Sequence, residues 1–168
     1  EALSILESEG VVERHKNGGT FLCKCSLKKI LSAVDIPHEC DSELFSDLKE
    51  TRAVVESRIG ELACRRADRL DLEKISSALD LMRQSVGRGE SGRKADLLFH
   101  QCIAMASKNQ VLAGIARSLG IAEEKIAAEI APDSAVCPES PEEHRAIYEA
   151  IRDRDPEKCS ALIQKHFE

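Results

Sequence analysis

Apolar residues recur at helical spacing from Ser42 to the C-terminus, and helix-start and helix-stop signals divide this pattern into segments. The first segment begins at Ser42, which can cap it, and runs to about Ala67. The second is capped by Asp68 or Asp71 and ends at Gly87. Because this spacing suits helices rather than strands, and because aromatic residues make up only 3% of the chain, we expect an all-α body.

Four further helical segments follow, separated by residues that favour turns. A third segment is expected to stop near Asn109, and a fourth covers residues 111–130 before a proline-containing loop. A fifth segment carries His144. Asp155-Pro156 then supplies a cap and a helix-starting proline for the last one.

Length, charge and cysteine content limit the class of protein. The 168 residues suffice for one ordinary domain and a fragment of another, and their formal net charge is −6. Nucleic-acid surfaces need concentrated lysine and arginine, so this charge argues against DNA contacts over most of the chain. The 7 cysteines are an odd number without CxxC spacing, which is typical of reduced thiols. No apolar run approaches the roughly 18 residues of a membrane span, so we expect a soluble, cytoplasmic protein without membrane contact.

One aspartate and three histidines in the helical segments have the chemistry of a metal site. Asp96 and His100 lie four residues apart, so on a helix both side chains point the same way. His144 and His166 lie in later segments, and convergence of these helices would complete a set of four ligands. Imidazole and carboxylate suit a divalent metal ion, with zinc expected first and nickel or iron as alternatives. A tetrahedral ion would then be closed, whereas a five- or six-coordinate ion would accept a small carboxylate; alternatively, these histidines are scattered and bind nothing.

The N-terminal residues have a different pattern. Residues 1–9 have apolar positions on one side and are followed by Gly10, which is typical of the end of a helix. Residues 11–15 and 20–23 flank Lys-Asn-Gly-Gly at 16–19, whose residues tolerate the positive φ angles of a tight hairpin. A helix followed directly by a small β-hairpin suggests the end of a winged helix.

These N-terminal residues carry a first family resemblance. The run Glu-Ala-Leu-x-x-Leu-Glu-x-Glu-Gly-Val-Val-Glu-Arg at 1–14, followed by Asn-Gly-Gly-Thr-Phe-Leu at 17–22, resembles the end of the recognition helix and the wing of GntR-type bacterial transcription regulators. The resemblance implies that the other winged-helix elements precede Glu1. Residues 1–25 are then a remnant of the DNA-binding domain, and residues 26–42 form a linker with a short helix.

Residues 43–168 carry a second resemblance, to the ligand-binding domain of the FadR branch of these regulators, called the FCD domain. It rests on Glu50-Thr-Arg52-Ala-Val-Val-Glu56, on Asp96-x-x-x-His100-x-x-Ile103-Ala-x-Ala-Ser-x-Asn109-x-x-Leu112, and on Glu143-His144-x-x-Ile147-x-x-Ala150-Ile-x-x-x-Asp155-Pro, with His166 near the end. The resemblance implies an antiparallel bundle of six to seven helices around a cavity. In that cavity, metal binding falls to Asp96, His100, His144 and His166, and effector binding to Arg52.

Arg52 and Asn109 are the predicted effector-binding residues. A guanidinium matches a carboxylate with two hydrogen bonds, and an internal arginine requires an anionic partner. Glu56, one helical turn after Arg52, is the alternative partner. Asn109 also has two interpretations: an amide that faces the effector, or the polar end of the third helix.

Together these features favour a metabolite-responsive transcription regulator and not an enzyme. A small organic acid would bind at the metal and change how a homodimer presents two winged helices to operator DNA. One alternative is a metal-dependent hydrolase, which would need a general base such as Glu142 or Glu143 near a metal-bound water. Another is a dimerisation module with a structural metal. The winged-helix fragment favours the regulator over the hydrolase, because an enzyme has no evident use for it.

Overall fold

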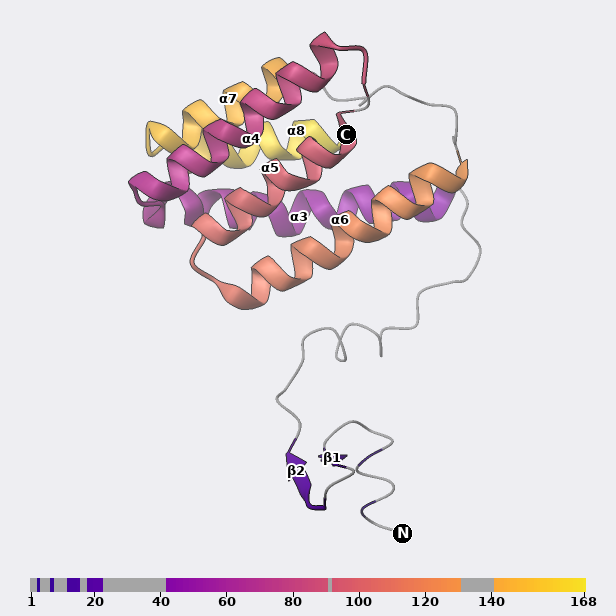
Figure 1. Cartoon of the computed structure of the whole chain (residues 1–168). Coiled ribbons are helices and arrows are strands. Elements are labelled where there is room, and N and C mark those ends of the chain that lie inside the picture. The colour runs from indigo at the N-terminus through magenta and orange to yellow at the C-terminus, as the bar shows by residue number, and fades with distance from the viewer. Residues whose placement is uncertain are drawn as a thin grey trace. The chain divides into compact units, whose positions relative to one another are not determined.

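The structure is a computed structural model of the whole chain (Figure 1). It describes residues 3, 7, 12–15, 18–22, 42–90, 92–130 and 141–168. The chain divides into two compact units, Glu1–Ile36 and Pro37–Glu168.

Three predicted elements lie mainly outside the described residues. The helix predicted over residues 1–9 is described only at Leu3 and Glu7, and both are helical. The linker predicted over 26–42 and the proline-containing loop predicted over 131–141 are described only at their last residues.

The described part of the smaller unit is mainly a β-hairpin. Strand β1 (Val12–Arg14) pairs in antiparallel register with β2 (Thr20–Leu22). Gly18 and Gly19 between them have φ angles of 91° and 102°, in the left-handed region that glycine adopts without steric cost. The hairpin therefore lies where the sequence predicts it.

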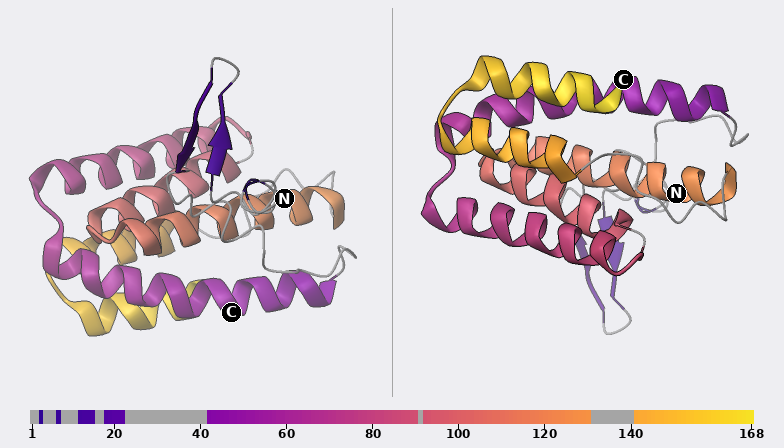
Figure 2. Two further views of the ribbon diagram at one scale, coloured as in Figure 1. Left: turned by 90° about the horizontal axis from the view of Figure 1, so that it is seen from below. Right: turned by 90° about the horizontal axis from the view of Figure 1, so that it is seen from above.

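The larger unit is all-α, as predicted. Its described part contains α3 (Ser42–Arg66), α4 (Arg69–Gly87), α5 (Arg93–Ala106), α6 (Gln110–Ile130), α7 (Pro141–Arg152) and α8 (Pro156–Phe167). Successive helices alternate in direction, so that α3, α5 and α7 run one way while α4, α6 and α8 return (Figures 1 and 2). Helix α3 packs against α5, α6, α7 and α8, and α4 covers α5 and α7. Helix α3 is therefore the element that joins most of the bundle.

Side-chain caps fix the start of two helices. Asp68 caps α4 by accepting from the Asp71 backbone N–H at 3.0 Å, and the Asp71 carboxylate accepts from the Asp68 N–H at 2.9 Å. Asp155 caps α8 by accepting from the Lys158 N–H at 3.0 Å, and Pro156 occupies the first helical position. Local sequence thus sets both boundaries, as predicted.

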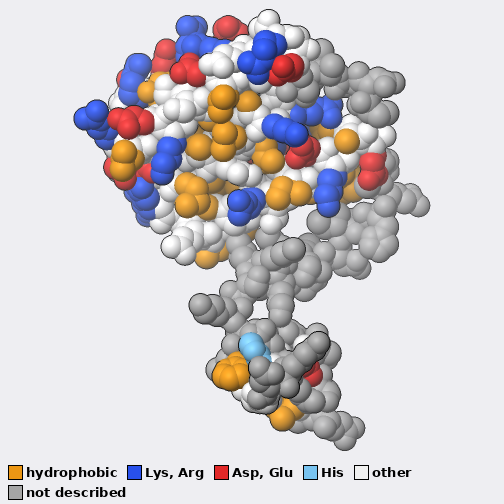
Figure 3. Space-filling view, in the orientation of Figure 1, with side chains coloured by type: hydrophobic (Ala, Val, Ile, Leu, Met, Phe, Trp, Pro, Cys, Tyr) orange, Lys and Arg blue, Asp and Glu red, His pale blue; other side chains and the backbone are white. Residues whose placement is uncertain are grey.

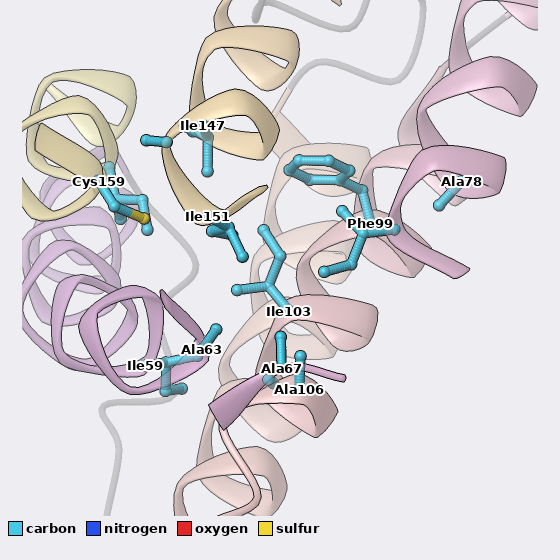
Figure 4. Close-up of a cluster of buried hydrophobic side chains, with 14 of the residues drawn as sticks. Ile59, Ala63, Ala67, Ala78, Phe99, Ile103, Ala106, Ile147, Ile151 and Cys159 are labelled. Atoms are coloured by element: carbon cyan, nitrogen blue, oxygen red, sulfur yellow. The ribbon is translucent and has the colours of Figure 1, made fainter. Parts of the chain in front are cut away.

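An apolar core lies where α3, α4, α5, α7 and α8 meet (Figure 4). Ile151 of α7 is 0% exposed, and Figure 4 shows it beside Ile103 of α5. Close packing of α3 on α8 depends on Gly60: a Cβ there would lie 2.5 Å from Ile163 Cδ1 and 2.8 Å from Cys159 Sγ. A residue with a side chain at this position would push the two helices apart.

The surface of the larger unit carries charges of both signs. On the face shown in Figure 3, Lys and Arg side chains alternate with Asp and Glu, and hydrophobic side chains lie between them. This pattern differs from the concentrated positive charge of a nucleic-acid surface. Among the described residues, no helix combines the length and the apolar composition that spanning a membrane requires.

Candidate metal centre

Four potential metal ligands from three helices converge in the larger unit. Asp96 and His100 come from α5, His144 from α7 and His166 from α8. Each offers one ligand atom, and these atoms all lie within 4.8 Å of one another. The three histidines are buried, and Asp96 is half-buried. The structure therefore brings together the four predicted ligands, while the bound metal itself stays a prediction.

Local geometry explains this convergence. Asp96 and His100 are one turn apart on α5 and share a face. His144 lies near the start of α7, and His166 lies in the last turn of α8. Because α7 and α8 pack together in opposite directions, the start of one lies beside the end of the other.

Several donor atoms are spaced near the separation that a zinc ion requires. His100 Nε2 lies 3.2 Å from His166 Nε2 and 3.7 Å from Asp96 Oδ1. His144 Nε2 lies 2.7 Å from the same Asp96 oxygen. Donors about 2.0–2.1 Å from a tetrahedral zinc ion are about 3.3 Å apart, so the observed distances lie around the required value. Three imidazoles and one carboxylate also suit nickel or iron.

Glu56 of α3 holds the ring of His100. His100 Nδ1 donates a hydrogen bond to Glu56 Oε2 at 2.6 Å. Since a carboxylate can only accept, the proton lies on Nδ1, and Nε2 is the ring atom that faces His166. Glu143, named above as a candidate base, has Oε2 3.4 Å from His166 Nδ1 and is half-exposed.

Arg52 lies beside the cluster on α3. Its Nε donates to Glu56 Oε1 at 2.7 Å, and its Nη1 contacts Glu123 Oε2 of α6. The guanidinium carbon lies 4.5 Å from the centre of the Phe167 ring, a cation–π contact. The remaining nitrogen, Nη2, is buried and has no hydrogen-bond partner among the described residues. A buried donor without a partner costs about 1–3 kcal/mol, so Nη2 marks a place for an acceptor.

Gly120 of α6 lies near this unpaired nitrogen and close to Leu97 of α5. A Cβ at Gly120 would lie 3.9 Å from Arg52 Nη2 and 2.7 Å from Leu97 Cδ1. Glycine therefore lets the Leu97 side chain pack directly against the backbone of α6.

Mutual electrostatic effects shift the titration of these groups. Burial would raise the pKa of Asp96 and of Glu56, but the neighbouring histidines, and for Glu56 also Arg52, outweigh it and lower both pKa values. Burial would lower the pKa of His100, yet the carboxylates of Glu56 and Asp96 raise it overall. Burial, together with its histidine neighbours, lowers the pKa of His166 to about 2. His166 is thus neutral at pH 7, as a metal ligand must be.

Asn109 lies away from the cluster. Its Oδ1 accepts from the backbone N–H groups of Val111 at 3.1 Å and Leu112 at 3.2 Å, so it caps the start of α6. It follows the end of α5, whereas Asp96 lies in the first turn of that helix, and it lines a surface groove of about 460 Å³ between α4, α5 and α6. The helix-end interpretation accounts for its amide oxygen, and an effector-binding role stays a prediction.

Two contacts of this site could not be predicted from the sequence: Glu56 with His100, and Arg52 with Glu123. Glu56 is bound to Arg52, as the alternative interpretation of Arg52 predicts. Its second bond, to His100, joins different helices and leaves no local signal. Glu123 lies 71 residues from Arg52, and only the packing of α6 on α3 brings the two together.

Comparison with known proteins identifies the family. The family model of the FCD domain matches residues 47–168. The HTH-type transcriptional regulator LutR of Bacillus subtilis is 36% identical over 112 residues, which cover 67% of this chain and 51% of that protein. The galactonate operon transcriptional repressor of Escherichia coli is 29% identical over 121 residues, 71% of this chain and 53% of that protein. The chain thus spans about half the length of these two relatives.

A solved structure described as Streptococcus agalactiae GntR shares the fold. Its TM-score is 0.69 with 22% sequence identity, and the match covers 99% of this chain and 76% of that one. The relatives named here are regulators and not enzymes. Since the FCD model covers most of the chain, the protein belongs to the FCD family of GntR-type regulators.

Proposed function

We propose that this chain is the sensing part of a bacterial transcription regulator that responds to a metabolite in the cytoplasm. It binds one divalent metal ion and a small organic acid, and it thereby controls operator binding by a homodimer. The observation that carries this proposal is the convergence of four metal-ligand side chains beside a buried arginine with an unpaired nitrogen. Membership of the FCD family and the names of the relatives support the link to transcription.

Asp96, His100, His144 and His166 hold the metal ion, for which zinc is the first choice and nickel or iron are the alternatives. When bound, the ion supplies a Lewis-acidic position that a carboxylate oxygen can occupy.

The charges around Arg52 link the binding of an acid to the binding of the metal. The carboxylates of Glu56, Asp96 and Glu123 outnumber the single guanidinium, so the site without a metal ion repels an anion. A divalent cation cancels that excess of negative charge, and Arg52 Nη2 then offers the second contact for the same carboxylate. Binding of the acid therefore requires the metal.

The signal reaches the DNA-binding domain through the helices that meet at the site. An acid bound to the metal and to Arg52 ties α3 to α5, α7 and α8, and this favours one arrangement of the bundle over others. In a homodimer, that shift changes how two winged helices, to which residues 1–25 belong, meet a palindromic operator.

Isothermal titration calorimetry with a panel of small organic acids tests this proposal, using hydroxy acids, dicarboxylates and sugar acids. The wild-type protein is titrated zinc-loaded and metal-stripped, beside Arg52→Ala and the control Arg58→Ala, an exposed arginine on the same helix. We expect one acid to bind the zinc-loaded wild-type protein at least about tenfold more tightly than it binds zinc-loaded Arg52→Ala. The reason is that a hydrogen bond to a charged group contributes about 1.5–3 kcal/mol. Arg58→Ala should match the wild type.

The same experiment separates the regulator from a dimerisation module with a structural metal. If the best acid binds the metal-stripped protein as tightly as the zinc-loaded one, the metal serves only the fold. That result would overturn the sensing mechanism.

A further inference from the structure

Glu56 makes hydrogen bonds to both halves of the proposed site. Its Oε1 accepts from Arg52 Nε at 2.7 Å, and its Oε2 accepts from His100 Nδ1 at 2.6 Å. The side chain is buried, with 3% of its surface exposed. Both carboxylate oxygens are therefore bound, one to the predicted anion-binding residue and one to a predicted metal ligand.

Each of the two bonds fixes a different orientation. The bond from His100 Nδ1 settles the ring tautomer and turns Nε2 toward His166. The bond from Arg52 Nε fixes the plane of the guanidinium and hence the direction of Nη2. Because Arg52 and Glu56 are one turn apart on α3, a single helix sets both directions.

We infer that Glu56 is a positioning residue that joins the metal site and the Arg52 anion site into one hydrogen-bonded unit. The inference rests on the proposed function and adds to it a route by which metal binding and acid binding support each other. A carboxylate behind a ligating histidine orients the ring and makes it a better donor to the metal. The ion then holds His100 in place, and through Glu56 it holds Arg52 in the orientation that receives an acid.

The isosteric substitution Glu56→Gln breaks this unit without changing its volume. An amide offers one acceptor and one donor group, whereas Arg52 Nε–H and His100 Nδ1–H both need an acceptor. One of the two bonds must therefore be lost, or His100 must shift its proton to Nε2 and stop facing the metal with a lone pair. A matched control is Glu50→Gln, the same change at an exposed position of the same helix, outside the proposed site.

Zinc affinity measured by competition with a chromophoric chelator tests the role of Glu56. We expect Glu56→Gln to bind zinc about 10–100-fold more weakly than the wild type, the usual loss when the partner of a ligating histidine is removed. Glu50→Gln should stay within about twofold. Equal affinities of Glu56→Gln and the wild type would overturn the inference while leaving the metal site standing. Failure of the wild type to bind zinc would overturn the proposed function and this inference together.

Two further readouts keep the test independent of folding effects. Cobalt(II) in place of zinc should give a visible absorption spectrum that differs between Glu56→Gln and the wild type but not between Glu50→Gln and the wild type. In the zinc-loaded wild-type protein, nitrogen NMR should show His100 with a protonated Nδ1 and a metal-bound Nε2. Ligation through Nδ1 would contradict the role of Glu56 even if every variant at this position failed to fold.

Discussion

Two parts of the helical bundle bury opposite kinds of side chains, although α3, α5, α7 and α8 contribute to both. The apolar layer includes Ile59, Ala63, Ile103, Ile147, Ile151, Cys159 and Ile163, with Ile75, Ala78, Leu79 and Met82 of α4, and the polar layer consists of Arg52, Glu56, Asp96, His100, His144 and His166. Helices α3, α5 and α7 pass from the polar to the apolar layer along their length, while α8 runs back and ends in the polar layer. The change takes about one turn, as from Glu56 to Ile59 or from His100 to Ile103.

The two layers contribute differently to stability. Burying one large apolar side chain contributes about 1.5–3 kcal/mol and requires only a fitting shape. A buried ion pair must first offset its desolvation, and well-packed apolar residues in its place are often as stable or more stable. The apolar layer thus supports the fold, whereas under the proposed function the polar layer serves binding. The layers should respond in opposite ways to substitution and to zinc.

The largest effect is expected from a cavity in the apolar layer. Ile151→Ala should lower the free energy of unfolding by about 2–5 kcal/mol, because Ile151 is fully buried and the space cannot refill. The folded variant should still bind zinc within about twofold of the wild type, since Ile151 is no ligand. Urea unfolding and chelator competition measure the two quantities. A large loss of zinc affinity at unchanged stability would mean that the layers do not act separately.

Zinc should stabilise the polar layer without any change of sequence. Free zinc at about 100 times its dissociation constant is expected to raise the free energy of unfolding by about 2.7 kcal/mol, because the ion binds the folded state. Ile151→Ala should gain as much as the wild type, whereas a variant without His144 should gain far less. Urea unfolding with and without zinc measures the gain. Equal stabilisation of the His144 variant would place the ion elsewhere.

Two glycine substitutions compare how tightly helices pack in the two layers, with smaller expected changes in stability. Gly60→Ala should cost about 1–3 kcal/mol, because the new methyl group meets the buried Ile163 and Cys159 side chains. Gly120→Ala should change stability by less than about 1 kcal/mol, since the gain in helix propensity offsets a shift of the half-buried Leu97 side chain. Thermal unfolding gives the stability of both variants. Equal costs at the two positions would show that α6 packs on the polar layer as tightly as α8 packs on α3.

A further contrast concerns pH, measured as the urea midpoint of the metal-free protein. The pKa of His166 is lowered to about 2 in the folded state, so this histidine binds a proton more readily in the unfolded state than in the folded state. Stability should therefore fall as pH drops below about 6.5. The raised pKa of His100 has the opposite effect on stability. Its contribution to the free energy of unfolding is complete below about pH 6.5 and is lost as pH rises through the raised pKa. We therefore expect a maximum near pH 6.5.

Excess zinc should move that maximum to higher pH, because the ion binds only deprotonated histidines. An unchanged maximum would show that these histidines do not bind the metal.

The helices follow from the sequence because their signals are local. The apolar period and the Asp68 and Asp155 caps lie within the segments that they define, so neighbours in the sequence suffice to place them. The same holds for Asp96 and His100, whose four-residue spacing already puts both on one helical face.

The support of the site depends on packing and does not follow from local pattern. Glu123 reaches Arg52 only because α6 lies on α3, and the sequence around Glu123 does not differ from that of a solvated helix. The bond from Glu56 to His100 likewise needs α3 and α5 in register. The contacts of Asn109, in contrast, are local. Its side chain binds backbone N–H groups at the start of α6, and the interpretation of Asn109 as the polar end of a helix accounts for them.

Metal content measured by mass spectrometry after equilibration with zinc tests the central claim most directly. We expect one zinc ion per chain in the wild type and in His15→Ala, a histidine of the hairpin outside the cluster, and a strong loss in His100→Ala and in His166→Ala. Wild-type zinc content in both cluster variants would contradict the assignment of the polar layer as a metal site.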